Sequence, residues 1–316
     1  MEQIVSCFPK IDICWHNTQS SVRSELMIPE CDVILSFRDA ESTLGRAVRS
    51  ILEQSHENLR LIAIDDGSSD RSLQVLNSFK DSRVHVVTND RTLGLPASLN
   101  RGVGLSTAPF IARMDADDIS HPSRLAEQLK ILENRKELDL VGSAVVCMDS
   151  KERLLGQRVY PTEHSEIIQR PYRSIPIAHP TWCGRREWFM KNPYDSKCLK
   201  SQDQALLRSA RHDSRFANLP QPLLAYREST AVRPMATLRS RRFLARDILR
   251  SATSERRPFA GLLGAAGVLS RWSLDVLVWA SGNPRFATHR FQPLPHELQI
   301  EWQSILGDSH VTSPRG

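Results

Sequence analysis

The sequence predicts an α/β fold with a mostly parallel central sheet, helices on both faces and a helical C-terminal region. Short apolar runs of strand type alternate with segments whose apolar residues recur at helical spacing, which is the pattern of a parallel sheet. Two clusters of aspartates follow such runs directly. Because open parallel sheets bind ligands at the carboxyl ends of their strands, we expect both clusters to lie in a binding site.

The individual elements follow from these runs in order. The first strand is predicted at 32–37, and the apolar residues of the next segment, 44–52, lie on one helical face. The second strand, at 59–64, ends in Asp65-Asp66-Gly67, which offers a turn and capping oxygens for a helix reaching residue 79. Further strands are predicted at 84–87 and 110–114, and further helices at 95–102 and 124–134.

The composition indicates a folded chain in a reducing compartment. Its 316 residues, 40% hydrophobic and 25% charged, are enough for one large domain or two modest ones. The six cysteines include no CxxC pair and no His at zinc-finger spacing, so we interpret them as reduced packing residues. Residues 1–30 lack the charged start and apolar run of a signal peptide, and we treat them as an extension.

Three carboxylates gather within four residues, at Asp115, Asp117 and Asp118, directly after an apolar strand. Such close like charges repel unless a cation lies between them, and carboxylate oxygens suit Mg²⁺ or Mn²⁺ bound to substrate phosphates. The alternative is a solvated turn that caps the next helix. The sequence contains neither a GxGxxG fingerprint nor a P-loop, so phosphate binding would depend on another group.

The two clusters belong to a longer series of motifs in a fixed order. The segments are 33–41, 50–55, 64–70, 89–95 and 114–125, followed by 177–181, 202–208, 216–220 and 223–227. In order and spacing they resemble glycosyltransferase family 2, and the segment around Asp115-Ala-Asp117-Asp118 is similar to the DxD region of that family. The resemblance covers residues 31–228, for which it implies a GT-A nucleotide-sugar-binding domain.

The resemblance also implies roles for particular residues on the donor side. The donor would be a nucleotide-diphosphate sugar, most simply a UDP-sugar, bound with Mg²⁺ or Mn²⁺. Asp66 would hold the edge of the base with Phe37, Glu41 and Arg91 nearby; Asp117 would bind the metal, and Asp115 would help to position the sugar or ribose.

On the acceptor side, Asp203 matches the catalytic acid of the family. It would take the proton from the acceptor hydroxyl as general base, with inversion in a single displacement. His179 and Trp182 would border the acceptor, although a structural histidine and a core tryptophan are the alternatives. Glu228 stands where some members carry a metal-binding His, so we name no third metal ligand.

The C-terminal region, 229–316, carries the excess positive charge of the chain. Eight arginines and two acids in residues 229–260 give a net charge of +6, equal to that of the whole chain. Residues 238–249 suit a basic amphipathic helix, and two apolar stretches, 259–270 and 274–280, are too short to span a bilayer. Such a segment either lies on an anionic membrane surface or packs against the catalytic domain.

We therefore expect a sugar transferase acting on a glycan or lipid-linked acceptor, without nucleic-acid partners. We place it in the cytoplasm, with a peripheral contact to the cytoplasmic face of the inner membrane if the basic segment binds lipid. A GT-A-like nucleotidyltransferase and a catalytically silent sugar-nucleotide or membrane-binding module are the alternatives. The retention of Asp66, Asp115, Asp117 and Asp203 together favours the enzyme.

Overall fold

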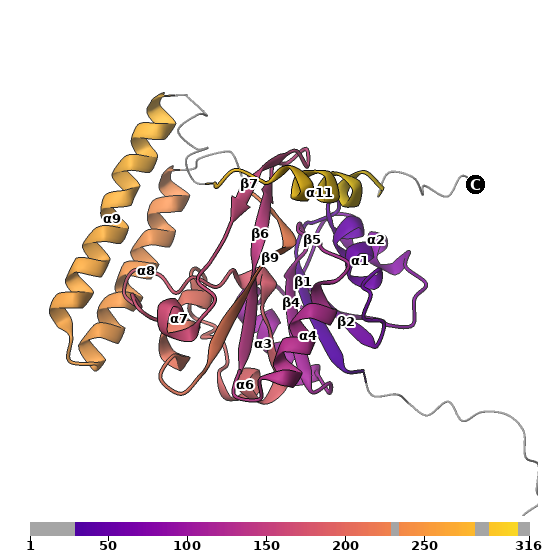
Figure 1. The fold of residues 1–316 in the computed structure, drawn as a ribbon, viewed down its shortest axis with the longest axis horizontal. Coiled ribbons are helices and arrows are strands. Elements are labelled where there is room, and N and C mark those ends of the chain that lie inside the picture. The colour runs from indigo at the N-terminus through magenta and orange to yellow at the C-terminus, as the bar shows by residue number, and fades with distance from the viewer. Residues whose placement is uncertain (1–28, 229–233, 282–290, 309–316) are drawn as a thin grey trace, which may run out of the picture.

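The protein is described by a computed structural model that covers residues 29–228, 234–281 and 291–308 (Figure 1). The predicted N-terminal extension lies almost wholly outside these ranges. A nine-stranded mixed sheet, in the order β3-β2-β1-β4-β8-β6-β9-β5 with β7 beside β6, forms the centre. Its strands are β1 Cys31–Phe37, β2 Leu59–Asp65, β3 Val84–Thr88, β4 Phe110–Asp115, β5 Ile119–Ser120, β6 Leu140–Met148, β7 Leu154–Arg158, β8 Cys183–Arg185 and β9 Phe216–Arg227.

The helices alternate with the strands in the first half of the chain, as the sequence predicts. The predicted helix at 124–134 has those bounds, and the other predicted elements agree to within a few residues. The helices are α1 Leu44–Leu52, α2 Ser72–Asn77, α3 Leu95–Leu105, α4 Arg124–Asn134, α5 His164–Ile167, the 3₁₀ turn η1 His179–Thr181, α6 Arg186–Lys191, α7 Gln202–Ala210, α8 Pro234–Ser254, α9 Pro258–Ser281 and α11 His296–Asp308.

Parallel pairing of β1 with β2 and β4 brings the two acidic clusters to one edge of the sheet. Phe37 pairs with Asp65 on one side of β1, and Ser36 pairs with Asp115 on the other. The carboxyl ends of β1, β2 and β4 therefore lie side by side along one edge of the sheet. The prediction that both clusters follow strand ends is confirmed, and the two strands, β2 and β4, flank β1.

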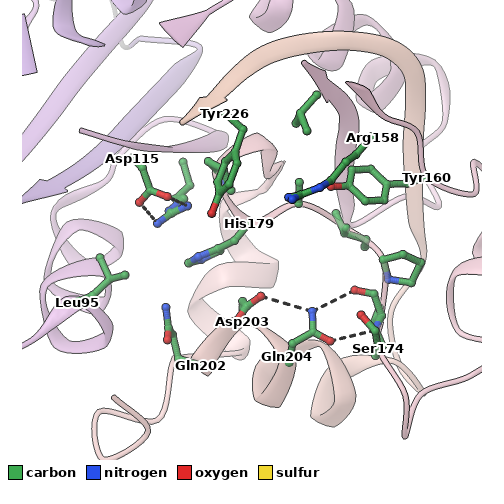
Figure 2. A pocket seen from close by; sticks show the side chains of 17 residues that line it. Leu95, Asp115, Arg158, Tyr160, Ser174, His179, Gln202, Asp203, Gln204 and Tyr226 are labelled. Carbon is green, nitrogen blue, oxygen red and sulfur yellow. Dashed lines mark hydrogen bonds and ion pairs between the residues drawn. The ribbon is translucent and has the colours of Figure 1, made fainter. Parts of the chain in front are cut away.

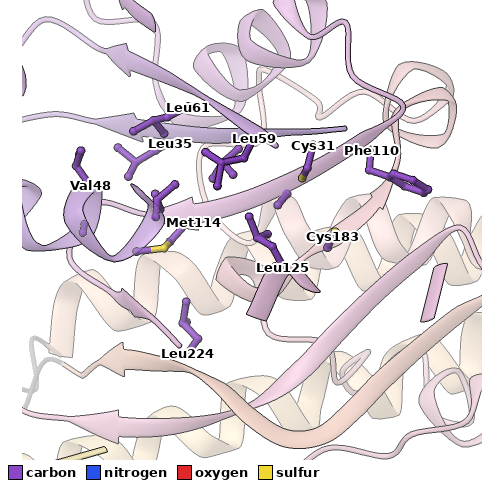
Figure 3. Packing of buried hydrophobic residues seen from close by; sticks show 14 of the residues in the cluster. Cys31, Leu35, Val48, Leu59, Leu61, Phe110, Met114, Leu125, Cys183 and Leu224 are labelled. Atoms are coloured by element: carbon purple, nitrogen blue, oxygen red, sulfur yellow. The ribbon is translucent and has the colours of Figure 1, made fainter. Parts of the chain in front are cut away.

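Alternating side chains of the strands fill two cores, one on each face of the sheet. Val33 and Leu35 of β1 pack with α1 and α4 in the larger core, which Figure 3 shows around Leu61, Met114 and other residues. Ile34 points to the opposite core, under α3. Gly102 lets α3 approach closely, since a Cβ there would lie 2.6 Å from the Ile34 side chain. Helices thus cover both faces, as expected.

Helices α8 and α9 form a hairpin that packs against α7 at one side of the domain (Figure 1). Arg208, which is fully buried on α7, donates from Nε to Asp247 of α8 at 2.8 Å. Arg211 pairs with Glu255, which also accepts a hydrogen bond from Tyr172 at 2.5 Å. Hydrogen bonds from these partners lower the pKa of the Glu255 carboxyl to about 2, although its burial acts to raise it.

The two apolar stretches on either side of Arg271 form one continuous helix, α9. Within the described ranges, no helix has both the length and the apolar character needed to cross a bilayer. The last described helix, α11, packs on the central sheet. Its Trp302 is fully buried beside Ile119 and Val146, and Arg46 donates to the Leu306 carbonyl at 2.7 Å.

Candidate active site

The acidic triad lies where β4 ends and the chain turns into β5. One carboxylate oxygen from each of Asp115, Asp117 and Asp118 lies within 4.8 Å of the others. Asp118 is buried, and its Oδ1 accepts the Arg227 backbone N–H at 2.8 Å, whereas its Oδ2 has no partner in the described residues. Burial raises the pKa of Asp118 well above its usual range, and the charges of Asp115 and Asp117 add to this effect.

These residues fit a divalent cation. Three hard oxygen donors gather in one place, and one buried carboxylate oxygen lacks a hydrogen-bond donor, which is a costly arrangement unless a cation offsets it. The expected metal ligand Asp117 is exposed, and Asp115 is partly exposed, so an ion could reach both from solvent. Mg²⁺ is commonly held by one or two carboxylates together with substrate phosphates, which such a site would allow.

Arg113 lies beneath the triad and pairs with Asp115. It is two residues earlier on β4, so both side chains project from the same face of the strand. Its guanidinium forms a bidentate contact with the Asp115 carboxylate, with Nη1 at 3.1 Å from Oδ2. Sequence reasoning missed Arg113, although the two-residue strand period around Asp115 could have identified it.

Asp66 lies at the end of β2 in a different environment. Its Oδ1 accepts hydrogen bonds from the side chains of Asn89 and Ser98 and from the Leu93 backbone N–H, and its Oδ2 accepts the Gly94 N–H at 2.9 Å. Burial acts to raise the pKa of Asp66, but these donors outweigh it and lower the pKa. One accepting position remains on Oδ2, which is where a donor base could bind.

The other expected donor residues lie around the same edge but not in one pocket. Phe37 is buried in the larger core, and its carbonyl accepts the Asp66 N–H at 2.9 Å. The Arg71 Nε donates a hydrogen bond to Glu41 Oε1 at 2.7 Å. Arg91 is exposed. Phe37 therefore supports the Asp66 turn from below, and only Glu41 and Arg91 present side chains to solvent.

Asp203 lies at the start of α7 and faces a cavity of about 380 Å³ that Asp115 also lines (Figure 2). Among the described residues, the side chain that donates to Asp203 is the neighbouring Gln204, whose Nε2 lies 3.4 Å from Oδ2. Loss of solvent raises the pKa of Asp203, and hydrogen bonding to Gln204 and the charge of Arg113 oppose this rise. A weakly satisfied carboxylate of raised pKa is suited to accept a proton.

His179 lies in the same cavity, between Asp115 and Asp203 in the view of Figure 2. Its Nε2 is 2.8 Å from the Tyr194 hydroxyl. Burial, with the charge of Arg113, lowers the pKa of His179 well below its usual range, so the ring is neutral at neutral pH. The structure therefore brings together three of the expected site residues, Asp115, His179 and Asp203.

Trp182 does not reach this cavity. Its side chain is 0% exposed and packs edge-on against His179 and Trp188, and it stacks on Tyr194 at 6.2 Å between ring centroids. No face of the ring is open to a sugar. In this fold Trp182 supports His179 from behind, which corresponds to the core-packing alternative.

Three further side chains line the cavity opposite Asp203. Tyr226 of β9 carries its hydroxyl toward the space between Asp115 and His179, and Arg158 of β7 lies beside Tyr160 (Figure 2). Arg158 pairs with Glu228, which is therefore engaged by a cation rather than turned to the triad. Arg158 and Tyr160 had no signal in the sequence, because only the pairing of β7 with β6 brings them here.

A family model described as glycosyl transferase family 2 matches residues 32–192, about half of the chain. An uncharacterized glycosyltransferase of Methanocaldococcus jannaschii is 28% identical over 200 residues, covering 62% of this chain and 69% of the relative. The Escherichia coli UDP-Glc:alpha-D-GlcNAc-diphosphoundecaprenol beta-1,3-glucosyltransferase WfgD is 31% identical over 100 residues, covering 32% of this chain and 40% of the relative.

The fold matches a solved glycosyltransferase along most of its length. The mannosyltransferase PcManGT from Pyrobaculum calidifontis, solved with GDP-Man and Mn²⁺, superposes with a TM-score of 0.56 at 14% identity, covering 90% of this chain and 87% of that one. At this identity the match concerns the fold alone. The ordered motifs, the GT-A architecture and the family model agree, and the chain belongs to glycosyltransferase family 2.

Proposed function

We propose that the enzyme transfers a hexose from a UDP-linked donor to a hydroxyl of a lipid-linked or glycan acceptor, with inversion and with the help of a divalent metal. The observation that carries the proposal is the cavity that Asp203 and Asp115 of the triad both line, because a donor diphosphate bound at the triad would then lie next to a potential base. The UDP-glucose and lipid-diphosphate substrates in the name of WfgD support the choice of donor and acceptor.

The chain would contribute to the reaction at three points. Asp203 would accept the proton of the acceptor hydroxyl as its oxygen attacks the anomeric carbon, while the bond from that carbon to the diphosphate oxygen breaks. Arg113 would hold Asp115 in place beside the sugar. A bound Mg²⁺ or Mn²⁺ would stabilise the departing nucleoside diphosphate, with Asp117 as a ligand. Attack from the face opposite the leaving group inverts the anomeric carbon.

The test is a panel of nucleotide sugars assayed with Mg²⁺, Mn²⁺ or excess chelator. We expect release of nucleoside diphosphate with one donor, dependent on metal and increased by an acceptor. Calorimetry should give donor binding that is lost in chelator and in Asp117→Asn. Release of pyrophosphate instead would indicate a nucleotidyltransferase, and equal donor affinity with chelator and with Mn²⁺ would exclude the metal.

We further propose that the hairpin of α8 and α9 rests on an anionic membrane surface. It exposes large apolar side chains, Met235 at 74%, Phe259 at 73%, and Leu262 and Leu263 at about 60%. Met235 shares a hollow with Arg239, Arg242 and Arg246 of α8, and each arginine could contribute about 1 kcal/mol near an anionic bilayer. The hairpin also packs on α7, so the two expectations for this region, membrane contact and closure of the domain, are compatible.

Vesicle co-sedimentation tests this contact. Binding should rise with the fraction of anionic lipid and fall with salt. The double variant Phe259→Ser/Leu262→Ser should bind less, whereas Met190→Ser, which changes an exposed apolar residue on α6, should not. Equal sedimentation of the hairpin variant and the parent protein would exclude the hairpin as the contact.

A further inference from the structure

A second hollow, separate from the catalytic cavity, lies between α9 and the segment 169–173. It has a volume of about 710 Å³. Its α9 side is formed by residues spaced three or four apart, which places them on one face of the helix. These residues are Ala260, Leu263, Gly264, Gly267, Val268 and Arg271. We refer to this hollow as the arginine groove.

The groove combines positive charge with an apolar lining. Arg170, Arg173, Arg257 and Arg271 border it, and no acidic side chain does so among the described residues. Within the described ranges, Arg170, Arg173 and Arg257 form no ion pair, unlike the nearby Arg208 and Arg211. A guanidinium group can donate two parallel hydrogen bonds to the oxygens of one phosphate. A cluster of arginines therefore fits a phosphorylated ligand.

The floor of the groove is open at Gly267, where an added Cβ would meet no atom within 4 Å. At Gly264, by contrast, α9 touches the opposite wall, because a Cβ there would lie 2.4 Å from the Tyr172 carbonyl oxygen. The apolar rim continues outward to Leu263, which is 61% exposed on the surface proposed to face the membrane. A ligand in this groove would thus have an anionic part near the arginines and an apolar part toward the lipid.

A smaller hollow of about 280 Å³ lies between the groove and the catalytic cavity and shares lining residues with each. Arg170, Arg173 and Arg271 border both the groove and this hollow, and Ser174 and Pro176 border both the hollow and the catalytic cavity. One acid, Glu166, lines the connection.

Gln204 fixes this connecting segment to the helix that carries Asp203. Its amide donates to the Ile175 carbonyl at 3.1 Å and accepts the Ile175 N–H at 3.0 Å. Ser174 and Pro176, which flank Ile175 and border both the smaller hollow and the cavity, are therefore held in place beside the proposed base.

We propose that the arginine groove binds the diphosphate and first isoprenoid units of a polyprenyl-diphosphate-linked acceptor, whose sugar reaches Asp203 through the connecting hollow. This inference rests on the proposed glycosyl transfer and specifies its acceptor. Charge, apolar lining, openness toward the hairpin surface and continuity with the cavity all fit a ligand with an anionic head and an isoprenoid tail. A soluble glycan would use neither the arginines nor the apolar rim.

Farnesyl diphosphate is a suitable probe, and calorimetry in excess chelator suppresses its binding at the metal-dependent donor site, so that binding in the groove is measured alone. The full chain should bind it more tightly than inorganic pyrophosphate or farnesol. Arg170→Gln/Arg173→Gln should weaken this binding about tenfold or more. Gly267→Leu, which fills the floor but keeps the arginines, should weaken farnesyl diphosphate more than pyrophosphate. The matched control Arg239→Gln/Arg242→Gln removes the same charge from α8 outside the groove and should bind like the parent.

Unchanged affinity in Arg170→Gln/Arg173→Gln would overturn the proposal, as would pyrophosphate binding as tightly as farnesyl diphosphate. Metal-dependent binding of the sugar donor, measured on the same variants, reports separately on the proposed function. Normal donor binding with no effect of the variants on farnesyl diphosphate would reject the groove alone. If the parent protein did not bind the donor, the proposed donor and its dependence on metal would be rejected, whatever the groove binds.

Discussion

Asp66 and Asp118 are both buried carboxylates that follow strands flanking β1, yet their surroundings are opposite. Asp66 accepts four hydrogen bonds, and its pKa is lowered. Asp118 accepts one, leaves Oδ2 without a described partner, and has a raised pKa. The difference teaches that burial of an acid does not by itself indicate function. Asp66 organises a loop and keeps one accepting position for a donor base, whereas Asp118 keeps an oxygen without a hydrogen-bond donor, which a cation could contact.

Asp203 belongs with the unsatisfied group, and its replacement gives the largest expected effect. Asp203→Asn keeps the size of the side chain but cannot accept a proton, so transfer should fall by about 10²-fold or more. Donor affinity should change little, because the triad is intact. Single-turnover assays and calorimetry separate the two quantities. Full turnover by this variant on the true acceptor would show that another group is the base.

The expected change in stability differs in sign between the two strand-end acids. Asp66→Asn loses charge-assisted hydrogen bonds and should destabilise the protein by about 1–3 kcal/mol. Asp118→Asn removes a buried charge beside two like charges, so the metal-free protein should melt at the same temperature or higher. Thermal melts in chelator measure both.

The same pair can be compared in donor binding. Asp118→Asn should weaken metal-dependent donor binding even though it does not destabilise the fold. Equal destabilisation by the two substitutions would remove the distinction between satisfied and unsatisfied acids. If Asp118→Asn left the affinity for the donor in the presence of metal unchanged, Asp118 would have a structural role and would not be a metal ligand.

The sequence predicted the fold and the triad because both depend on local patterns. Strand and helix periods placed β1 to β4 and α4 within a few residues, and Asp115 to Asp118 are contiguous. It did not predict the cavity wall formed by Arg158 and Tyr160, because distant segments meet there only through sheet pairing.

Burial was the second property that the motifs could not predict. The same motif contains the exposed Asp117 and the buried Asp118, and nothing in the residue types distinguishes them. Likewise, the turn at Asp66 reads as a simple cap in sequence, whereas its four hydrogen-bond donors come from residues 89–98. Partners that distant in the chain become visible only when β2 and α3 pack together.

The pH profile provides the finest comparison, because the pKa values of Asp66 and Asp203 shift in opposite directions. Loss of solvent raises the pKa of Asp203, so this base becomes protonated at a higher pH than an ordinary aspartate. Its activity is present above that pKa and should fall about tenfold for each pH unit below it. With metal and donor saturating, the acid limb of kcat should therefore lie above the range of an unperturbed aspartate. Residual transfer by Asp203→Asn should lack this limb. Persistence of the same limb in that variant would assign it to a different group, and Asp66 would be a poor candidate because its hydrogen bonds keep it ionised to lower pH.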